Sequence, residues 1–186
     1  MKIEVVDYDP KWKIWFARLS RIYNDNIGQS IVKIEHVGST SVEGLCAKPC
    51  LDIDLVIKDY TEFKSVKKEL MDLGYEYEGD YGIQGRESFR RKDKNVPWDG
   101  TNEIKHNHNL YVCPEGSREL RRHVAFREHL KDDDECREAY ARLKRRLASQ
   151  NRYDREAYTD GKTKFIERVL EEISNKNECG LKEKHR

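Results

Sequence analysis

The 186-residue sequence lacks long hydrophobic runs. Its first seven residues, Met-Lys-Ile-Glu-Val-Val-Asp, contain no apolar core of the kind that a secretion signal needs. Nowhere does an apolar stretch approach the roughly 20 residues that cross a bilayer as a helix. We therefore expect neither secretion nor membrane insertion, and at this length we expect one hydrophobic core rather than two.

Cysteine is also scarce. The five cysteines are odd in number and scattered, which is not typical of a disulfide-stabilised secreted domain, so we expect a reducing cytoplasmic location. Cys46 and Cys50 have a C-x3-C spacing that zinc sites can use, but no second Cys or His pair of matching spacing follows. The sequence therefore argues against structural zinc.

An excess of one charge is absent as well, because 36 Lys and Arg residues face 35 Asp and Glu residues. No global field would draw the protein to nucleic acid or to an anionic membrane. The basic run Lys144-Arg145-Arg146 has no interleaved aromatic residues, so it favours a solvated helix face over a nucleic-acid interface. Any anion-binding site must be local.

Apolar periodicity predicts the order of elements in the first two thirds of the chain. A helix is predicted to begin at Asp9-Pro10 and to end at Gly28. The remaining elements are a strand over 31–37, a strand over 51–58, a helix over 63–73 that Gly74 closes, and strands around 85–92 and 106–113.

The last third of the sequence is predicted to be helical, with apolar faces over 120–130, 136–147 and 158–173. From residue 174 the pattern stops, and we expect residues 174–186 to form a disordered, charged tail. This order predicts an α+β fold with an α/β-like core: a mixed sheet, flanking helices and a C-terminal helical cap, in a single domain over residues 1–173.

Asp52 and Asp54 are the first candidates for chemistry. Side chains two residues apart on a strand share a face, so these carboxylates would lie side by side while the apolar residues between them face the core. A hard divalent cation such as Mg²⁺, or Mn²⁺, removes their repulsion and recruits phosphate oxygens. The alternative is an edge strand whose polar face is simply solvated.

The turn before this strand strengthens the first interpretation. Gly38 allows close backbone approach, Ser39, Thr40 and Ser41 offer hydroxyl groups, and free backbone amides in such a turn can cradle a phosphate. The same four residues are also compatible with an ordinary loop or helix cap. What favours a site is the combination of this turn with two aspartates about a dozen residues later.

Several motifs together resemble the GrpB-like family. The main one runs from Ile34 through the turn to Asp54. The others are Asp9-Pro10-x-Trp12, His108-Asn109-Leu110-Tyr111-Val112, Phe126-Arg127-x-x-Leu130, Tyr140-x-x-Leu143-Lys144 and Tyr158-x-x-x-Lys162-x-x-Phe165-Ile166, so that the resemblance covers about residues 5–173.

The resemblance implies the nucleotidyltransferase fold superfamily, with Gly38 and Ser39 holding phosphate and Asp52 and Asp54 holding metal. Where the family often has His-Leu-His, this chain has Asn109 and Tyr111, which weakens any metal role there. The superfamily usually carries a third carboxylate on a later strand, and no clear partner is present. The candidates by location are Glu87 and Glu103, with His108 as a candidate metal ligand on the matching strand.

Two Tyr-x-x-x-Lys repeats supply cations. They place Lys144 and Lys162 one helical turn after a tyrosine, at the edge of an apolar stripe, where a lysine either reaches a bound anion or simply extends into water. Further candidates for binding phosphate are Lys48, Arg86, Arg90 and Arg127.

The sequence thus leads to three hypotheses. The first is a Mg²⁺-dependent nucleotidyltransferase that moves a nucleotidyl group from a nucleoside triphosphate to an unknown small-molecule or protein acceptor. The second is a catalytically silent module that binds a nucleotide or another anion, and the missing third acid motivates it. The third is a metal-dependent phosphate-ester hydrolase that uses water as its nucleophile.

Overall fold

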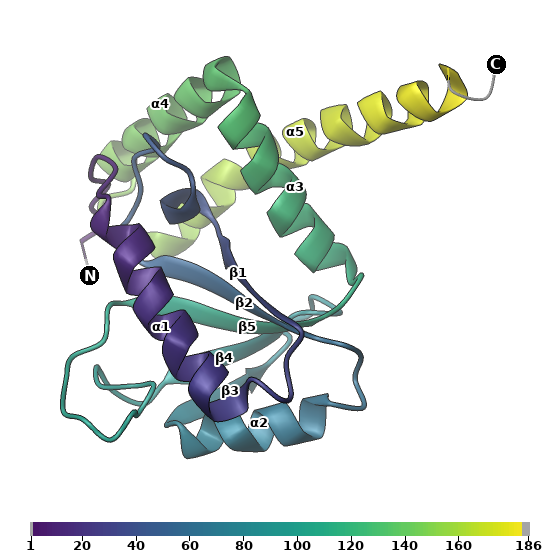
Figure 1. Cartoon of the computed structure of the whole chain (residues 1–186). Coiled ribbons are helices and arrows are strands. Elements are labelled where there is room, and N and C mark those ends of the chain that lie inside the picture. The colour runs from purple at the N-terminus through teal and green to yellow at the C-terminus, as the bar shows by residue number, and fades with distance from the viewer. Residues whose placement is uncertain (1, 184–186) are drawn as a thin grey trace.

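The structure is a computed structural model that describes residues 2–183, and side chains as far as residue 176. Figure 1 shows the arrangement of its elements. The helices are α1 (Lys11–Ile27), α2 (Phe63–Asp72), α3 (Arg118–Asp132), α4 (Asp134–Gln150) and α5 (Arg155–Glu183), with a short 3-10 turn, η1 (Ser39–Ser41). The strands are β1 (Lys33–Val37), β2 (Leu51–Ile57), β3 (Tyr75–Gly79), β4 (Glu87–Arg91) and β5 (His108–Pro114).

Within residues 2–183 the strands form one five-stranded mixed sheet in the order β1-β2-β5-β4-β3. β2 and β5 are parallel, whereas the pairs β1 with β2, β4 with β5 and β3 with β4 are antiparallel. With helices packed on the sheet and a helical cap after β5, the predicted α+β class is confirmed.

One face of the sheet is apolar and carries the main core. Leu51, Ile53, Leu55 and Ile57 of β2 are buried there against α1 and α2. The α1 residues Trp12, Leu19, Tyr23 and Ile27 recur at helical spacing and belong to the same cluster, which is why this segment folds as an amphipathic helix. This core fixes β2, and so fixes the side chains on its other face.

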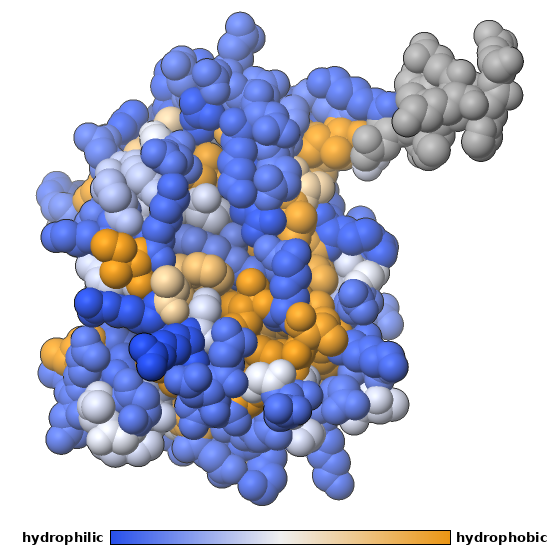
Figure 2. All heavy atoms as spheres, in the orientation of Figure 1, coloured by the Kyte–Doolittle hydropathy of each residue, from blue (hydrophilic) through white to orange (hydrophobic). Residues whose placement is uncertain are grey.

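The opposite face lies under the C-terminal helices. Val42 and Leu45, which follow the turn η1, pack with Leu130 of α3 and Tyr140 of α4 in a separate apolar cluster. In Figure 1, α5 passes behind the sheet and then extends away from the rest of the molecule. In the same view, Figure 2 shows mostly hydrophilic side chains on the surface, with hydrophobic ones gathered between α1 and α3.

Two parts of the structure differ from the sequence-based expectation. The strand β3 was not predicted, because Tyr75-Glu76-Tyr77 is a short run followed by glutamate and glycine. In the structure, a β-bulge between Tyr77 and Gly79 interrupts the pairing of β3 with β4. α5 continues to Glu183, so the predicted tail is helical to that residue, while 184–186 lie outside the described residues. Among residues 2–183, no helix is long and apolar enough to span a membrane.

Candidate functional site

The turn at Gly38 brings the chain directly against Asp52. Gly38 has φ +67°, in the left-handed region that favours glycine. A Cβ atom there would lie 2.2 Å from Asp52 Oδ2, so only glycine allows this approach. The Ser41 hydroxyl donates to the Gly38 carbonyl oxygen at 2.6 Å and stabilises the turn, while Ser39 and Thr40 line an adjacent cavity.

Asp52 and Asp54 lie on the polar face of the sheet, as the alternation predicts. In register, Asp52 is opposite Asn109 and Asp54 is opposite Tyr111 of the parallel strand β5. The Asn109 amide donates to Asp52 Oδ1 at 2.7 Å. Burial raises the pKa of Asp52, and this hydrogen bond partly offsets the shift. The neighbouring strand therefore places an amide, not a third carboxylate, beside Asp52.

Asp54 is paired with a histidine that the sequence reasoning did not find. His123 of α3 has its Nδ1 atom 2.7 Å from Asp54 Oδ2. Asp54 is 0% exposed, and its Oδ1 atom has no hydrogen-bond partner among the residues that the structure describes. Burial lowers the pKa of His123, but the hydrogen bond and the charge of Asp54 outweigh it, so the pKa is raised.

A small cavity of about 220 Å³ opens beside Asp52 and Asn109. Cationic side chains from three segments line it: Lys48 from the loop before β2, Lys144 from α4, and Arg155 and Lys162 from α5. We call this cavity the cationic pocket. The structure thus brings together the predicted Lys48, Lys144 and Lys162, and adds Arg155.

The lysines of the cationic pocket are partly or fully buried. Lys144 donates a hydrogen bond to the Cys46 carbonyl oxygen, and burial lowers the pKa of Lys144 to about 7. Burial also lowers the pKa of Lys48 and of Lys162, although the charge of Asp52 opposes the shift in both. Burying several ammonium groups around one cavity is unfavourable unless an anion offsets their charge.

The predicted arginines do not enter this pocket. Arg90 forms ion pairs with Glu76 and Glu78 at the far edge of the sheet. Arg127 pairs with Glu35 at 2.6 Å and donates to a backbone carbonyl oxygen, so its charge is already offset. Arg86 lies over the Tyr111 ring, 4.8 Å from its centroid. A periodic sequence pattern cannot reveal which carboxylate neutralises an arginine.

His108 faces the opposite side of the sheet from the aspartates. It is in register with Leu51, and its Nε2 atom lies 2.5 Å from the Tyr75 hydroxyl in a buried cluster. The candidate carboxylates are also elsewhere. Glu87 accepts hydrogen bonds from Tyr60 and Tyr77, and Glu103 forms ion pairs beside α1. The structure therefore separates His108 from any metal at Asp52 and Asp54.

Asp52 and Asp54 are the donors that remain for Mg²⁺. No group of three or more His, Cys, Asp or Glu side chains in the described part of the chain is placed to hold a metal ion. Mg²⁺ often takes only one or two carboxylates and completes its shell with phosphate oxygens and water. The unpartnered Asp54 Oδ1 atom and the neighbouring carboxylate of Asp52 are compatible with such a site.

The chain belongs to the GrpB family, because the family described as GrpB protein matches residues 2–172. The resemblance noted from the motifs is therefore confirmed. The chain is 32% identical over 171 residues to the UPF0157 protein BH1888 of Halalkalibacterium halodurans, covering 90% of this chain and 80% of that protein. It is 25% identical over 173 residues to the glutamate-rich protein GrpB of Alkalihalophilus pseudofirmus, covering 92% and 96%.

A solved structure agrees with this membership. The crystal structure of the conserved protein GrpB from Enterococcus faecalis matches with a TM-score of 0.77 and 28% identity, over 94% of this chain and 99% of that chain. Cid1 in complex with its short product ApU matches with a TM-score of 0.48 and 15% identity, over 77% and 41%. The second likeness is too low to carry an inference.

Proposed function

We propose that the cationic pocket binds the phosphate chain of a nucleoside triphosphate and that the protein transfers the nucleotidyl group to an acceptor. The observation that supports this most strongly is the convergence of Lys48, Lys144, Arg155 and Lys162 on the Gly38 turn and Asp52. Cations, a serine turn and the Asp52 carboxylate meet at one point, with Asp54 two residues further along the same face of β2, which is a composition suited to phosphoryl chemistry.

The size of the pocket supports a phosphate chain as its content. At about 220 Å³ it is smaller than the roughly 300–1,000 Å³ of pockets that enclose whole drug-sized ligands. The sugar and base would therefore extend out of it. Lys162 and Lys144 would neutralise the phosphate oxygens, and the Ser39 hydroxyl would donate to one of them.

In the proposed reaction, an acceptor oxygen forms a bond to the α-phosphorus while the bridging bond between the α and β phosphates breaks. Pyrophosphate leaves with the electron pair, and the acceptor proton passes to water. Asp52 and Asp54 would hold Mg²⁺ or Mn²⁺, which when bound supplies positive charge to the phosphates. His123 would keep Asp54 in one orientation through its hydrogen bond.

The main competing proposal is a module that binds the nucleotide, or another anion, without turnover. Asn109, which stands in register with Asp52 where a third carboxylate would serve catalysis, favours it. Hydrolysis of a phosphate ester is the remaining alternative, and it differs only in using water as the acceptor.

Transfer of an α-³²P label from each nucleoside triphosphate to a metabolite extract tests the proposal. We expect labelled product with the unchanged protein and at least a hundredfold less with Asp54→Asn. The matched control is Asp132→Asn, which removes an exposed carboxylate at the end of α3. Equal transfer by the protein and Asp54→Asn would overturn nucleotidyl transfer.

Calorimetry separates the alternatives. Nucleotide binding that does not depend on Mg²⁺, together with no product from any acceptor, would favour the silent module. Release of a monophosphate or of inorganic phosphate without an acceptor would favour the hydrolase.

A further inference from the structure

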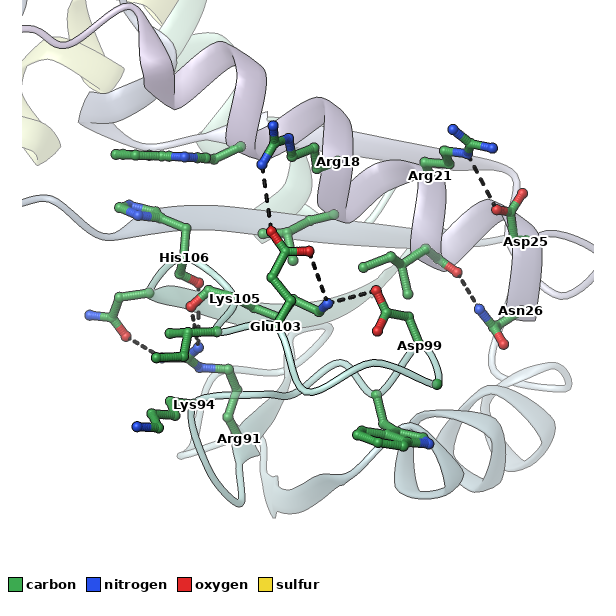
Figure 3. Close-up of a pocket in the computed structure, with 17 residues that line it drawn as sticks. Arg18, Arg21, Asp25, Asn26, Arg91, Lys94, Asp99, Glu103, Lys105 and His106 are labelled. Atoms are coloured by element: carbon green, nitrogen blue, oxygen red, sulfur yellow. Dashed lines mark hydrogen bonds and ion pairs between the residues drawn. The ribbon is translucent and has the colours of Figure 1, made fainter.

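A second cavity of about 1210 Å³ lies between α1 and the segment 92–107, which connects β4 to β5 (Figure 3). We call it the α1 groove. It has a larger volume than the cationic pocket and lies on the α1 side of the sheet. The function proposed above does not use it.

Flat apolar surface is available in the α1 groove. Trp15 of α1 stacks on His106, with ring centroids 3.8 Å apart. Across the groove, Trp98 and Ile104 of the 92–107 segment remain 46% and 60% exposed. Large apolar side chains left exposed beside a cavity are typical of a surface that a ligand covers.

The groove also carries a surplus of positive charge. Five Lys and Arg side chains line it against three carboxylates, among the residues that the structure describes. Glu103 lies between Arg18 and Lys105, and Asp99 pairs with Lys105 at 2.6 Å, so these charges offset one another (Figure 3).

Arg91 and Lys94 provide the surplus. Arg91 donates only to neutral acceptors, namely two backbone carbonyl oxygens and Asn107 Oδ1. Within the described part of the chain, neither Arg91 nor Lys94 has a carboxylate at ion-pair distance. Beside them, His106 Nε2 is buried without a hydrogen-bond partner among residues 2–176. The groove thus combines indole surface, unpaired cations and an unused polar atom.

The start of the parallel strands lies between the two cavities. Leu51 N donates to Asn107 O at 2.9 Å, so Cys50, which lines the cationic pocket, adjoins Asn107, which lines the α1 groove. A ligand in the groove is therefore separated from the cationic pocket by the first residues of β2 and β5.

We propose that the α1 groove binds a small organic anion with a planar apolar group. Its ring would pack on Trp98 and Trp15, and its acidic group would lie near Arg91 and Lys94.

Nuclear magnetic resonance of the indole N–H groups tests the binding site, with 2-naphthoate as the probe. The chain has three tryptophans, and Trp12 is an internal reference because it is 1% exposed in the core. We expect the Trp15 and Trp98 signals to shift with 2-naphthoate while the Trp12 signal stays. Acetate, which lacks the ring, and 2-naphthol, which is uncharged at neutral pH, should bind at least tenfold more weakly. Equal shifts of all three signals would overturn the proposal.

Variants sharpen the test. Trp98→Ala should weaken 2-naphthoate binding about tenfold, and Lys94→Glu about three- to tenfold. The matched controls are Tyr153→Ala, which removes a 72% exposed ring elsewhere, and Lys64→Glu, which makes the same charge change on α2. Unchanged affinity in both groove variants would overturn the assignment. If the Trp15 and Trp98 signals shift with protein concentration when no 2-naphthoate is present, a second copy of the chain occupies the groove. That result would also overturn the proposal.

The same variants separate this inference from the proposed function. Loss of 2-naphthoate binding in Trp98→Ala with unchanged ATP binding supports an independent groove site. If 2-naphthoate fails to bind while ATP binds and is turned over, the groove proposal fails and nucleotidyl transfer stands. If 2-naphthoate binds and the α-³²P assay shows no transfer, the groove proposal stands and the proposed function fails.

Discussion

The two faces of the sheet are built from alternate residues of the same strands, but they differ in what covers them. On β2, Ile53 and Leu55 face the core under α1 and α2, whereas Asp52 and Asp54 face helices from the last third of the chain. One side is closed by apolar packing alone. The other combines a smaller apolar cluster with hydrogen bonds and buried charged groups. The main core and the candidate site are thus separated by a single residue step along one strand.

The largest expected effect is on the apolar face. Leu55→Ala should lower the free energy of unfolding by about 3 kcal/mol, because a fully buried leucine leaves a cavity. Urea denaturation measures this, with Val32→Ala as the control at an exposed site. ATP affinity of the folded protein should not change. A change in that affinity would mean that the two faces are not independent.

The second prediction concerns the contact between the turn and the polar face. Gly38→Ala should destabilise the protein by about 2 kcal/mol and displace Asp52, because its Cβ would clash with Oδ2. Gly44→Ala is the matched control, since Gly44 also has a positive φ of +77° but nothing lies within 4 Å of an added Cβ. Equal urea midpoints for the two variants would contradict a specific role for the turn.

The third prediction tests the cations of the polar face. Lys162→Met should weaken binding of inorganic tripolyphosphate about tenfold, because one charged contact is lost. Lys164→Met, an exposed lysine on the same helix, should leave the affinity unchanged. Calorimetry at low ionic strength provides the measurement. Equal tripolyphosphate affinities for both variants would show that Lys162 does not contribute to anion binding.

The smallest effect is a pH dependence. Because the pKa of Lys144 is about 7, sulfate, whose charge is constant here, should bind up to about tenfold more weakly at pH 8 than at pH 6. The Lys144→Met variant should lose this dependence. The free energy of unfolding should change with pH in the opposite direction. Because the pKa of Lys144 is lower in the folded protein than its ordinary value of 10.5, the unfolded chain binds one more proton between these two values. The contribution of Lys144 to the free energy of unfolding therefore rises from pH 7 to pH 10.5. A sulfate affinity that is flat with pH would contradict a buried, titrating Lys144.

Much of the fold was predictable because it follows local patterns. Period-two alternation in β2 was sufficient to place Asp52 and Asp54 on one face, and the repeated Tyr-x-x-x-Lys spacing selected Lys144 and Lys162, which the structure brings into one pocket. Both signals depend only on residues a few positions apart.

The rest depends on partners that are distant in sequence. His123 contacts Asp54 across 69 positions, and nothing in the sequence around it distinguishes it from a solvent-facing helical histidine. Arg127 was a candidate anion ligand, but its charge is taken by Glu35, 92 positions away. His108 lies on the strand next to Asp52 and Asp54, but its side chain is on the opposite face of the sheet, where it contacts Tyr75.

The order of the chain has a consequence for synthesis on the ribosome. The strands of the described fold are complete at Pro114, whereas Lys144, Arg155 and Lys162 follow it. A nascent chain whose synthesis has just reached Pro114 therefore contains Asp52 and Asp54 of β2. It does not yet contain the helices and cations that cover this face in the folded protein. Until Arg155 and Lys162 are made, the cationic pocket lacks two of its four cations, although every strand of the described sheet is already present.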